Sequence, residues 1–172
     1  TRMDLAFQLA ESQTRAHDTE STVQDLMDYN KMVSDAKTDD VEIIFRKIDL
    51  EHAAVVAVGD SSFANVGKNK TASQAGLVVL IADNRDDMFL KGHAAQVSVL
   101  VWRSHRIKRV VRSTLTAETM AALEAVESGD LIRAHLAEIH YGLDYKTHAQ
   151  DVAAIKMIHV TDCKSLYDLL QK

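Results

Sequence analysis

The chain has 172 residues, 47% of them apolar and 26% charged, which is enough apolar content for one folded domain with an appended segment. Its apolar runs are far shorter than the roughly 18 residues of a membrane span, so we expect no transmembrane helix. The net charge of −5 excludes a generally basic surface, and a single cysteine, Cys163, excludes an internal disulfide. The N-terminus lacks the pattern of a secretory signal, and we expect an intracellular protein cut from a longer chain.

Residues 3–35 carry apolar side chains at helical spacing, which predicts two amphipathic helices. Asp18 and Thr19 lie between these helices and are expected to cap the second. Residues 41–48 are rich in β-branched side chains and predict a short strand. Residues 53–58 are continuously apolar and end at Gly59-Asp60, a pattern typical of a central strand covered on both faces.

Residues 74–82 and 96–104 predict two further strands, joined by a long polar loop over 83–95. From Leu115 the period becomes helical, and the helix is expected to end at Gly142. Residues 155–160 predict a buried strand, and 164–171 another helix. The order indicates an α/β domain over 51–172 with a mixed sheet: three antiparallel strands, a helix, a parallel strand and a helix. A helical extension over 1–50 precedes it.

Three carboxylates occupy places where functional groups converge in such sheets. Asp60 and Asp162 follow predicted strands, and Glu118 lies in the first turn of the predicted long helix. Each alone is typical of a turn or a helix cap. If the fold gathers all three, their repulsion requires a cation, and an all-oxygen ligand set favours Mg²⁺ or Mn²⁺. Two such ions about 4 Å apart would support phosphoryl hydrolysis, with the phosphate ester left open.

Charge is segregated along the chain. Residues 18–51 hold ten acidic and four basic residues, whereas 103–112 hold five bases and no acid. Those bases are Arg103, Arg106, Lys108, Arg109 and Arg112. They are typical either of a cationic binding stripe or of a solvated strand edge, and the pattern does not decide between the two.

Other candidates favour structural roles. Trp102 lies in an apolar run and is expected to pack in the core or at its rim rather than stack on a base. The histidines are scattered, and we expect surface or packing roles for them. Cys163 is expected to be a buried thiol at a helix start. Glu124 and Glu127 are expected on the solvent side of the long helix.

Five motifs in order resemble the ribonuclease H domain of copia-type retrotransposon polyproteins. They are Asp60-Ser61-Ser62-Phe63-Ala64-Asn65; Ser73-Gln74-Ala75-Gly76; Trp102-Arg103-Ser104 with Lys108-Arg109-Val110 and Arg112-Ser113; Ala117-Glu118-Thr119-Met120-Ala121; and Val160-Thr161-Asp162-Cys163-Lys164-Ser165-Leu166. The opening Thr1-Arg2-Met3-Asp4-Leu5-Ala6-Phe7 is similar to the end of the reverse-transcriptase part of the same polyproteins. The resemblance covers nearly the whole chain.

This resemblance implies a ribonuclease H fold and two-metal cleavage of the RNA strand of RNA–DNA hybrids during reverse transcription. Asp60, Glu118 and Asp162 match the family's acidic metal ligands. Residues 1–50 would be a connection segment from the reverse-transcriptase part, and that part of the same polyprotein would be a partner. The basic residues, with Ser104 and Ser113, would bind backbone phosphates. The setting implied is the cytoplasm, a virus-like particle or the nucleus.

One departure from the family concerns its fourth acidic residue, which lies on a later element. Asp168 does not match that position, so the C-terminal part of the domain is expected to be missing. An inactive module that holds template–primer or stabilises the reverse transcriptase is therefore the alternative to a nuclease. A host protein derived from such an element is a third possibility.

Overall fold

The computed structural model describes residues 2–16, 21–66 and 72–172. Five α-helices and four strands follow one another in these ranges, with short 3-10 turns at Leu50–His52 and Arg85–Asp87. The elements are α1 (Ala6–Ala16), α2 (Val23–Thr38), β1 (Ala53–Val66), β2 (Ala72–Asp83), β3 (Val97–Arg106), α3 (Thr114–Tyr141), α4 (His148–Ala154), β4 (Lys156–Val160) and α5 (Lys164–Leu170).

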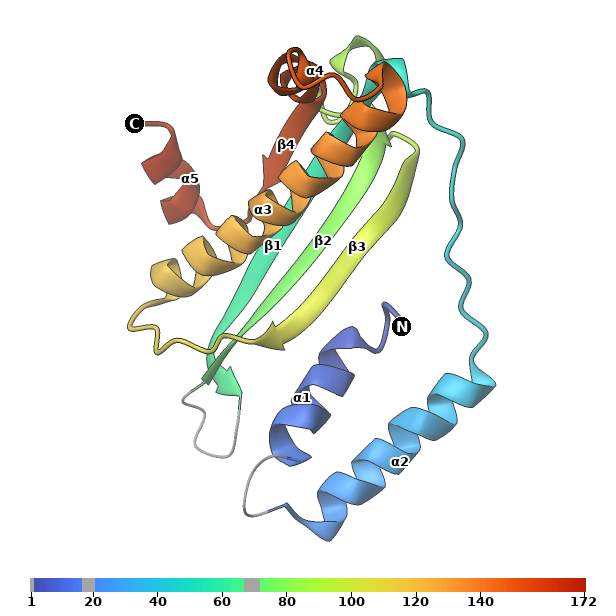
Figure 1. Ribbon diagram of the computed structural model, residues 1–172. Coiled ribbons are helices and arrows are strands. Elements are labelled where there is room, and N and C mark those ends of the chain that lie inside the picture. The colour runs from blue at the N-terminus through green and yellow to red at the C-terminus, as the bar shows by residue number, and fades with distance from the viewer. Residues whose placement is uncertain (1, 17–20, 67–71) are drawn as a thin grey trace.

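The four strands form one mixed sheet in the order β3-β2-β1-β4 (Figure 1). β1 pairs antiparallel with β2, β2 pairs antiparallel with β3, and β4 runs parallel to β1. The predicted α/β class with three antiparallel strands and one parallel strand is thus confirmed, and the arrangement is consistent with a ribonuclease H-like fold. Pairing between β1 and β4 ends at Val58 and Val160, so β1 continues past its parallel neighbour.

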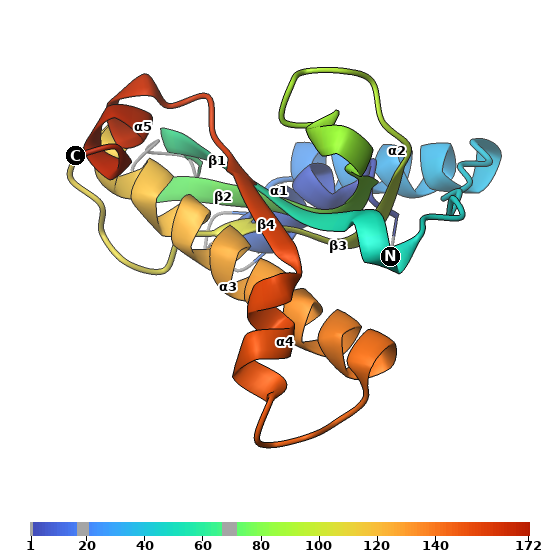
Figure 2. The ribbon, with the colours of Figure 1, turned by 90° about the horizontal axis from the view of Figure 1, so that it is seen from above.

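α3 covers one face of the sheet and α1 lies against the other (Figures 1 and 2). The side chains of Val55, Ala57 and Val79 face α3 and are fully buried. Small residues on the helix, including Ala125 and Gly129, let it approach the strands closely. α1 contacts β3, and Phe7 and Trp102 both line a groove on that face.

α2 packs against α1 rather than against the sheet (Figure 1). Thr22 caps it through a reciprocal capping box with Asp25. The expected caps, Asp18 and Thr19, lie outside the described residues. Val23 is 75% exposed, and Leu26 and Met27 are also exposed, so much of this helix's apolar surface faces solvent.

Some sequence predictions were wrong in detail. Residues 41–48, all of which the structure describes, form no strand: the Ser98 hydroxyl bonds both the N–H and the carbonyl of Arg46 in place of a backbone ladder. β4 is partly exposed rather than buried, because it is an edge strand with β1 on one side. α4 was not predicted at all. Within the described part of the chain, no helix is both long and apolar enough to cross a membrane.

Candidate metal centre

Three carboxylates from distant parts of the chain converge where β1 passes the end of β4. Asp60 lies within β1, Asp162 follows β4 by two residues, and Glu118 is the fifth residue of α3. One oxygen from each lies within 4.8 Å of the others. Asp60 does not end its strand and Glu118 begins the second helical turn, which corrects their predicted local positions. The predicted convergence of the three side chains is nevertheless present.

Glu118 differs from its two partners in burial. It is 6% exposed, whereas Asp60 and Asp162 are exposed. Burial raises the pKa of Glu118, a hydrogen bond from Ser61 opposes the rise, and the charges of Asp60 and Asp162 add to it. Its Oε1 accepts a 2.8 Å hydrogen bond from Ser61 Oγ, and its buried Oε2 has no partner among the described residues. The Glu118 carboxylate is therefore only half satisfied.

The close approach of α3 to β1 brings Glu118 within reach of Asp60. A Cβ atom built on Gly59 would lie 2.7 Å from the carbonyl oxygen of Ala121, which is less than any ordinary contact. Because glycine has no side chain, the helix backbone can rest directly on the strand. The residue before Asp60 thus sets the depth at which α3 packs.

The residues present fit a hard divalent cation. All three donors are carboxylate oxygens, the ligands that Mg²⁺, Mn²⁺ and Ca²⁺ prefer. A cation would supply the partner that Glu118 Oε2 lacks and would offset the repulsion that raises the pKa of this residue. We therefore treat the group as a candidate metal centre.

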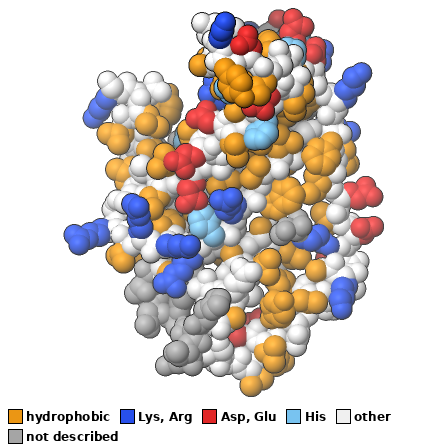
Figure 3. All heavy atoms as spheres, in the orientation of Figure 1, with side chains coloured by type: hydrophobic (Ala, Val, Ile, Leu, Met, Phe, Trp, Pro, Cys, Tyr) orange, Lys and Arg blue, Asp and Glu red, His pale blue; other side chains and the backbone are white. Residues whose placement is uncertain are grey.

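The predicted basic stripe begins within β3, at Arg103 and Arg106, and continues along the segment that leads into α3. Its five cationic side chains, Arg103, Arg106, Lys108, Arg109 and Arg112, are all exposed. Between these exposed cations, Ile107 is buried against Ala75 and Ala117. This contact anchors the segment between β3 and α3 to the rest of the domain. Figure 3 shows Lys and Arg side chains gathered over the segment between β3 and α3, with acidic side chains nearby.

The two serines predicted to join this stripe already have structural partners. Ser104 Oγ accepts a hydrogen bond from Gln74 Nε2, and Ser113 is the N-cap of α3, where its hydroxyl accepts from Thr116 N–H. Their binding role stays a prediction.

Several features escaped the sequence interpretation. Ser61 bonds two of the carboxylates, and no spacing rule marks it in advance. Glu124, expected on the solvent side, is half-buried and pairs with His105 at 3.1 Å, whereas Glu127 is exposed as expected. Cys163 starts α5 as predicted but is partly exposed rather than buried. Trp102 lies at the rim of the sheet, in the groove beside α1.

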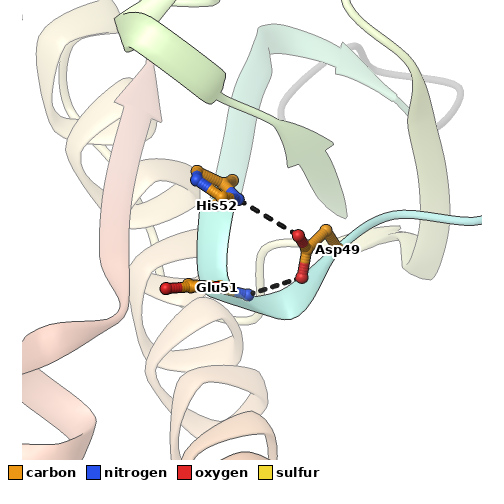
Figure 4. Close-up of side chains that lie close together, drawn as sticks. All are labelled: Asp49, Glu51 and His52. Atoms are coloured by element: carbon orange, nitrogen blue, oxygen red, sulfur yellow. Dashed lines mark hydrogen bonds and ion pairs between the residues drawn. The ribbon is translucent and has the colours of Figure 1, made fainter.

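A second group of possible ligands, Asp49, Glu51 and His52, lies just before β1 (Figure 4). All three are exposed, and Asp49 accepts from the Glu51 N–H and pairs with His52 Nδ1, both at 3.2 Å. One carboxylate oxygen of Glu51 lies within 4.8 Å of a ligand atom of each of the other two residues. Asp49 is the cap of a short 3-10 turn, which explains the group without a metal.

Comparison of the chain with protein-family models, curated proteins and solved structures gives no match. Function must therefore be inferred from the motifs and from the geometry of the carboxylates.

Proposed function

We propose that this protein is a metal-dependent nuclease of the ribonuclease H type, acting on the RNA strand of RNA–DNA hybrids. The observation that carries the proposal is the meeting of Asp60, Glu118 and Asp162 within 4.8 Å at the edge of a mixed sheet. The order of these residues along the chain and the motifs around them resemble those of copia-type retrotransposon ribonucleases H. The reverse-transcriptase portion of such a polyprotein is the partner that we propose for the helices α1 and α2.

The exposure of the two aspartates suits them to bind an ion that also contacts substrate, and the buried Glu118 carboxylate would be the third ligand of that ion. Two Mg²⁺ or Mn²⁺ ions, when bound, would activate a water and stabilise the leaving oxygen of a phosphodiester. Ser61 and Gly59 keep Glu118 beside Asp60.

The basic stripe supports a nucleic acid as the substrate. Lys108, Arg109 and Arg112 lie exposed on the segment that leads into the helix carrying Glu118, so a strand whose phosphate reached the carboxylates would pass near them. Arg103 and Arg106 lie exposed in β3, just before this segment. Contacts of this kind give affinity without sequence selectivity. They also offset the negative charge that the acidic centre would present to a phosphate backbone.

The test is cleavage of a labelled RNA–DNA hybrid in Mg²⁺ or Mn²⁺ by the parent protein and by Asp60→Asn. A matched control is Asp49→Asn, which removes an exposed carboxylate from the second acidic group. We expect the parent and Asp49→Asn to cleave the RNA strand and Asp60→Asn to be at least about 100-fold slower, because it weakens the metal centre.

Other outcomes separate the alternatives. Hybrid binding without cleavage, equal in the parent and in Asp60→Asn, would support the inactive module that holds template–primer. Cleavage that survives in Asp60→Asn would come from another site or a contaminant and would end the proposal.

A further inference from the structure

We propose that Ser61 is a positioning residue for the candidate metal centre, holding the carboxylates of Asp60 and Glu118 in the arrangement that receives a cation. The inference rests on the metal-binding part of the proposed function. It does not depend on hybrid cleavage.

Ser61 contacts two of the three carboxylates through different groups. Its hydroxyl donates a 2.8 Å hydrogen bond to Glu118 Oε1, and its backbone N–H donates a 2.7 Å hydrogen bond to Asp60 Oδ1. One residue of β1 thereby links the strand ligand to the helix ligand. Each aspartate or glutamate keeps its second oxygen for another partner.

The hydroxyl bond has a clear consequence for Glu118. A glutamate has three rotatable side-chain bonds, and fixing a free one costs conformational entropy. Ser61 fixes the carboxylate before any ion arrives, with Oε1 occupied and the buried Oε2 left without a partner among the described residues. Groups that orient a metal ligand in this way commonly contribute about 10-fold to 100-fold to metal affinity.

The neighbouring serine provides a matched control. Successive side chains of a strand point to opposite faces, so Ser62 faces away from Ser61. Ser62 lines the groove beside α1, as do Asp60 and Trp102. Ser62 shares no hydrogen bond with the carboxylates of the described residues. Ser62→Ala therefore removes the same atom one residue away without touching Glu118.

The experiment is a calorimetric titration of the full chain with Mn²⁺, using the parent, Ser61→Ala, Ser61→Thr and Ser62→Ala. We expect Ser61→Ala to bind Mn²⁺ about 10-fold or more weakly, and Ser61→Thr, which keeps the hydroxyl, to stay within about threefold of the parent. Ser62→Ala should match the parent. Melting in EDTA reports the fold of each variant, and Ser61→Cys, of similar shape but a weak donor, replaces Ser61→Ala if that variant does not fold.

Activity adds a second readout. Where the parent cleaves hybrid, Ser61→Ala should need about 10-fold more Mn²⁺ for half-maximal cleavage and recover most of the rate when Mn²⁺ is saturating. Because Mn²⁺ also stabilises the folded chain, the melting of each variant in EDTA separates this rescue from recovery of a folding defect.

The inference is overturned if Ser61→Ala binds Mn²⁺ as tightly as the parent, if Ser62→Ala loses as much affinity, or if the parent binds no Mn²⁺. Its failure is distinguishable from that of the nuclease proposal. Mn²⁺ binding that depends on Ser61 without cleavage leaves this inference standing and removes the nuclease, whereas cleavage with unchanged Ser61→Ala affinity does the reverse.

Discussion

Gly59 of β1 lies directly against the carbonyl group of Ala121 in α3, where a Cβ atom would be 2.7 Å from the oxygen. Because the clash is with helix backbone, a side chain at this position forces the helix away from the strand. We expect Gly59→Ala to lower the free energy of unfolding by about 1–3 kcal/mol and to weaken metal binding, since it separates Glu118 from Asp60.

Gly76 is the matched control for that substitution. It pairs with Asp60 across β1 and β2, and no atom of the described residues lies within 4 Å of a Cβ built on it. Urea unfolding of Gly59→Ala and Gly76→Ala compares the two sites. Equal losses of stability would show that the contact with Ala121 does not limit the packing.

The metal-free protein should be destabilised by Glu118 as pH rises. Burial and the neighbouring aspartates raise the pKa of Glu118, so the folded state keeps a proton that the unfolded chain has released. The free energy of unfolding therefore falls as pH rises from the ordinary glutamate pKa, 4.5, through the raised value.

Glu118→Gln removes this titration. Its stability relative to the parent should increase across that window and remain higher by about 1 kcal/mol at neutral pH. Urea unfolding in EDTA from about pH 4 to about pH 8 tests it. Glu127→Gln, an exposed change on the same helix, should show no such trend, and a pH-independent difference for Glu118→Gln would contradict the assignment.

Divalent cations should stabilise the folded chain through the three carboxylates. At ten times its dissociation constant an ion adds about 1.4 kcal/mol, because it binds the folded state alone. We expect Mg²⁺ or Mn²⁺ to raise the melting temperature of the parent and of Asp168→Asn, but not of Asp162→Asn. Asp168 is a suitable control because it is exposed on α5 and pairs with Lys164. An equal rise in both variants would place the ion elsewhere.

The basic stripe predicts a salt dependence for hybrid binding. Replacing Lys108 and Arg109 by Ala should weaken binding and flatten the slope of log K against log salt by up to about 2, near 0.9 for each phosphate that is no longer neutralised. Lys31→Ala with Lys37→Ala removes the same charge from α2. Fluorescence anisotropy of labelled hybrid at several salt concentrations compares the two double variants. An unchanged salt slope in the variant that lacks Lys108 and Arg109 would exclude the basic stripe from hybrid binding.

The order of the elements could be predicted because it depends on local patterns. The apolar run 53–58 has few alternatives to a central strand, and the helical period after Leu115 extends over many turns. Residues 41–48 carry an equally good strand pattern, but they form a strand only if their backbone pairs with an edge strand of the sheet. The Ser98 hydroxyl instead hydrogen-bonds with the backbone N–H and carbonyl of Arg46, and the sequence does not reveal this contact because the two residues are far apart along the chain.

The carboxylates of the candidate site could be predicted from the sequence, but the hydrogen bonds that hold them in place could not. Asp60, Glu118 and Asp162 stand out because each lies near the end of an apolar element. The Ser61 hydroxyl bond depends on the twist of β1 and on how deeply α3 packs, which the sequence does not specify. The pairing of His105 with Glu124 likewise needs the sheet and helix in place.

The carboxylates of the candidate centre come from a strand, a helix and the turn after another strand, so no contiguous piece of the chain holds all three. Local unfolding of any one of these segments removes a carboxylate from the candidate centre. A bound cation would thus act as a non-covalent cross-link among them, and its addition should slow amide hydrogen exchange in β1, α3 and β4 together.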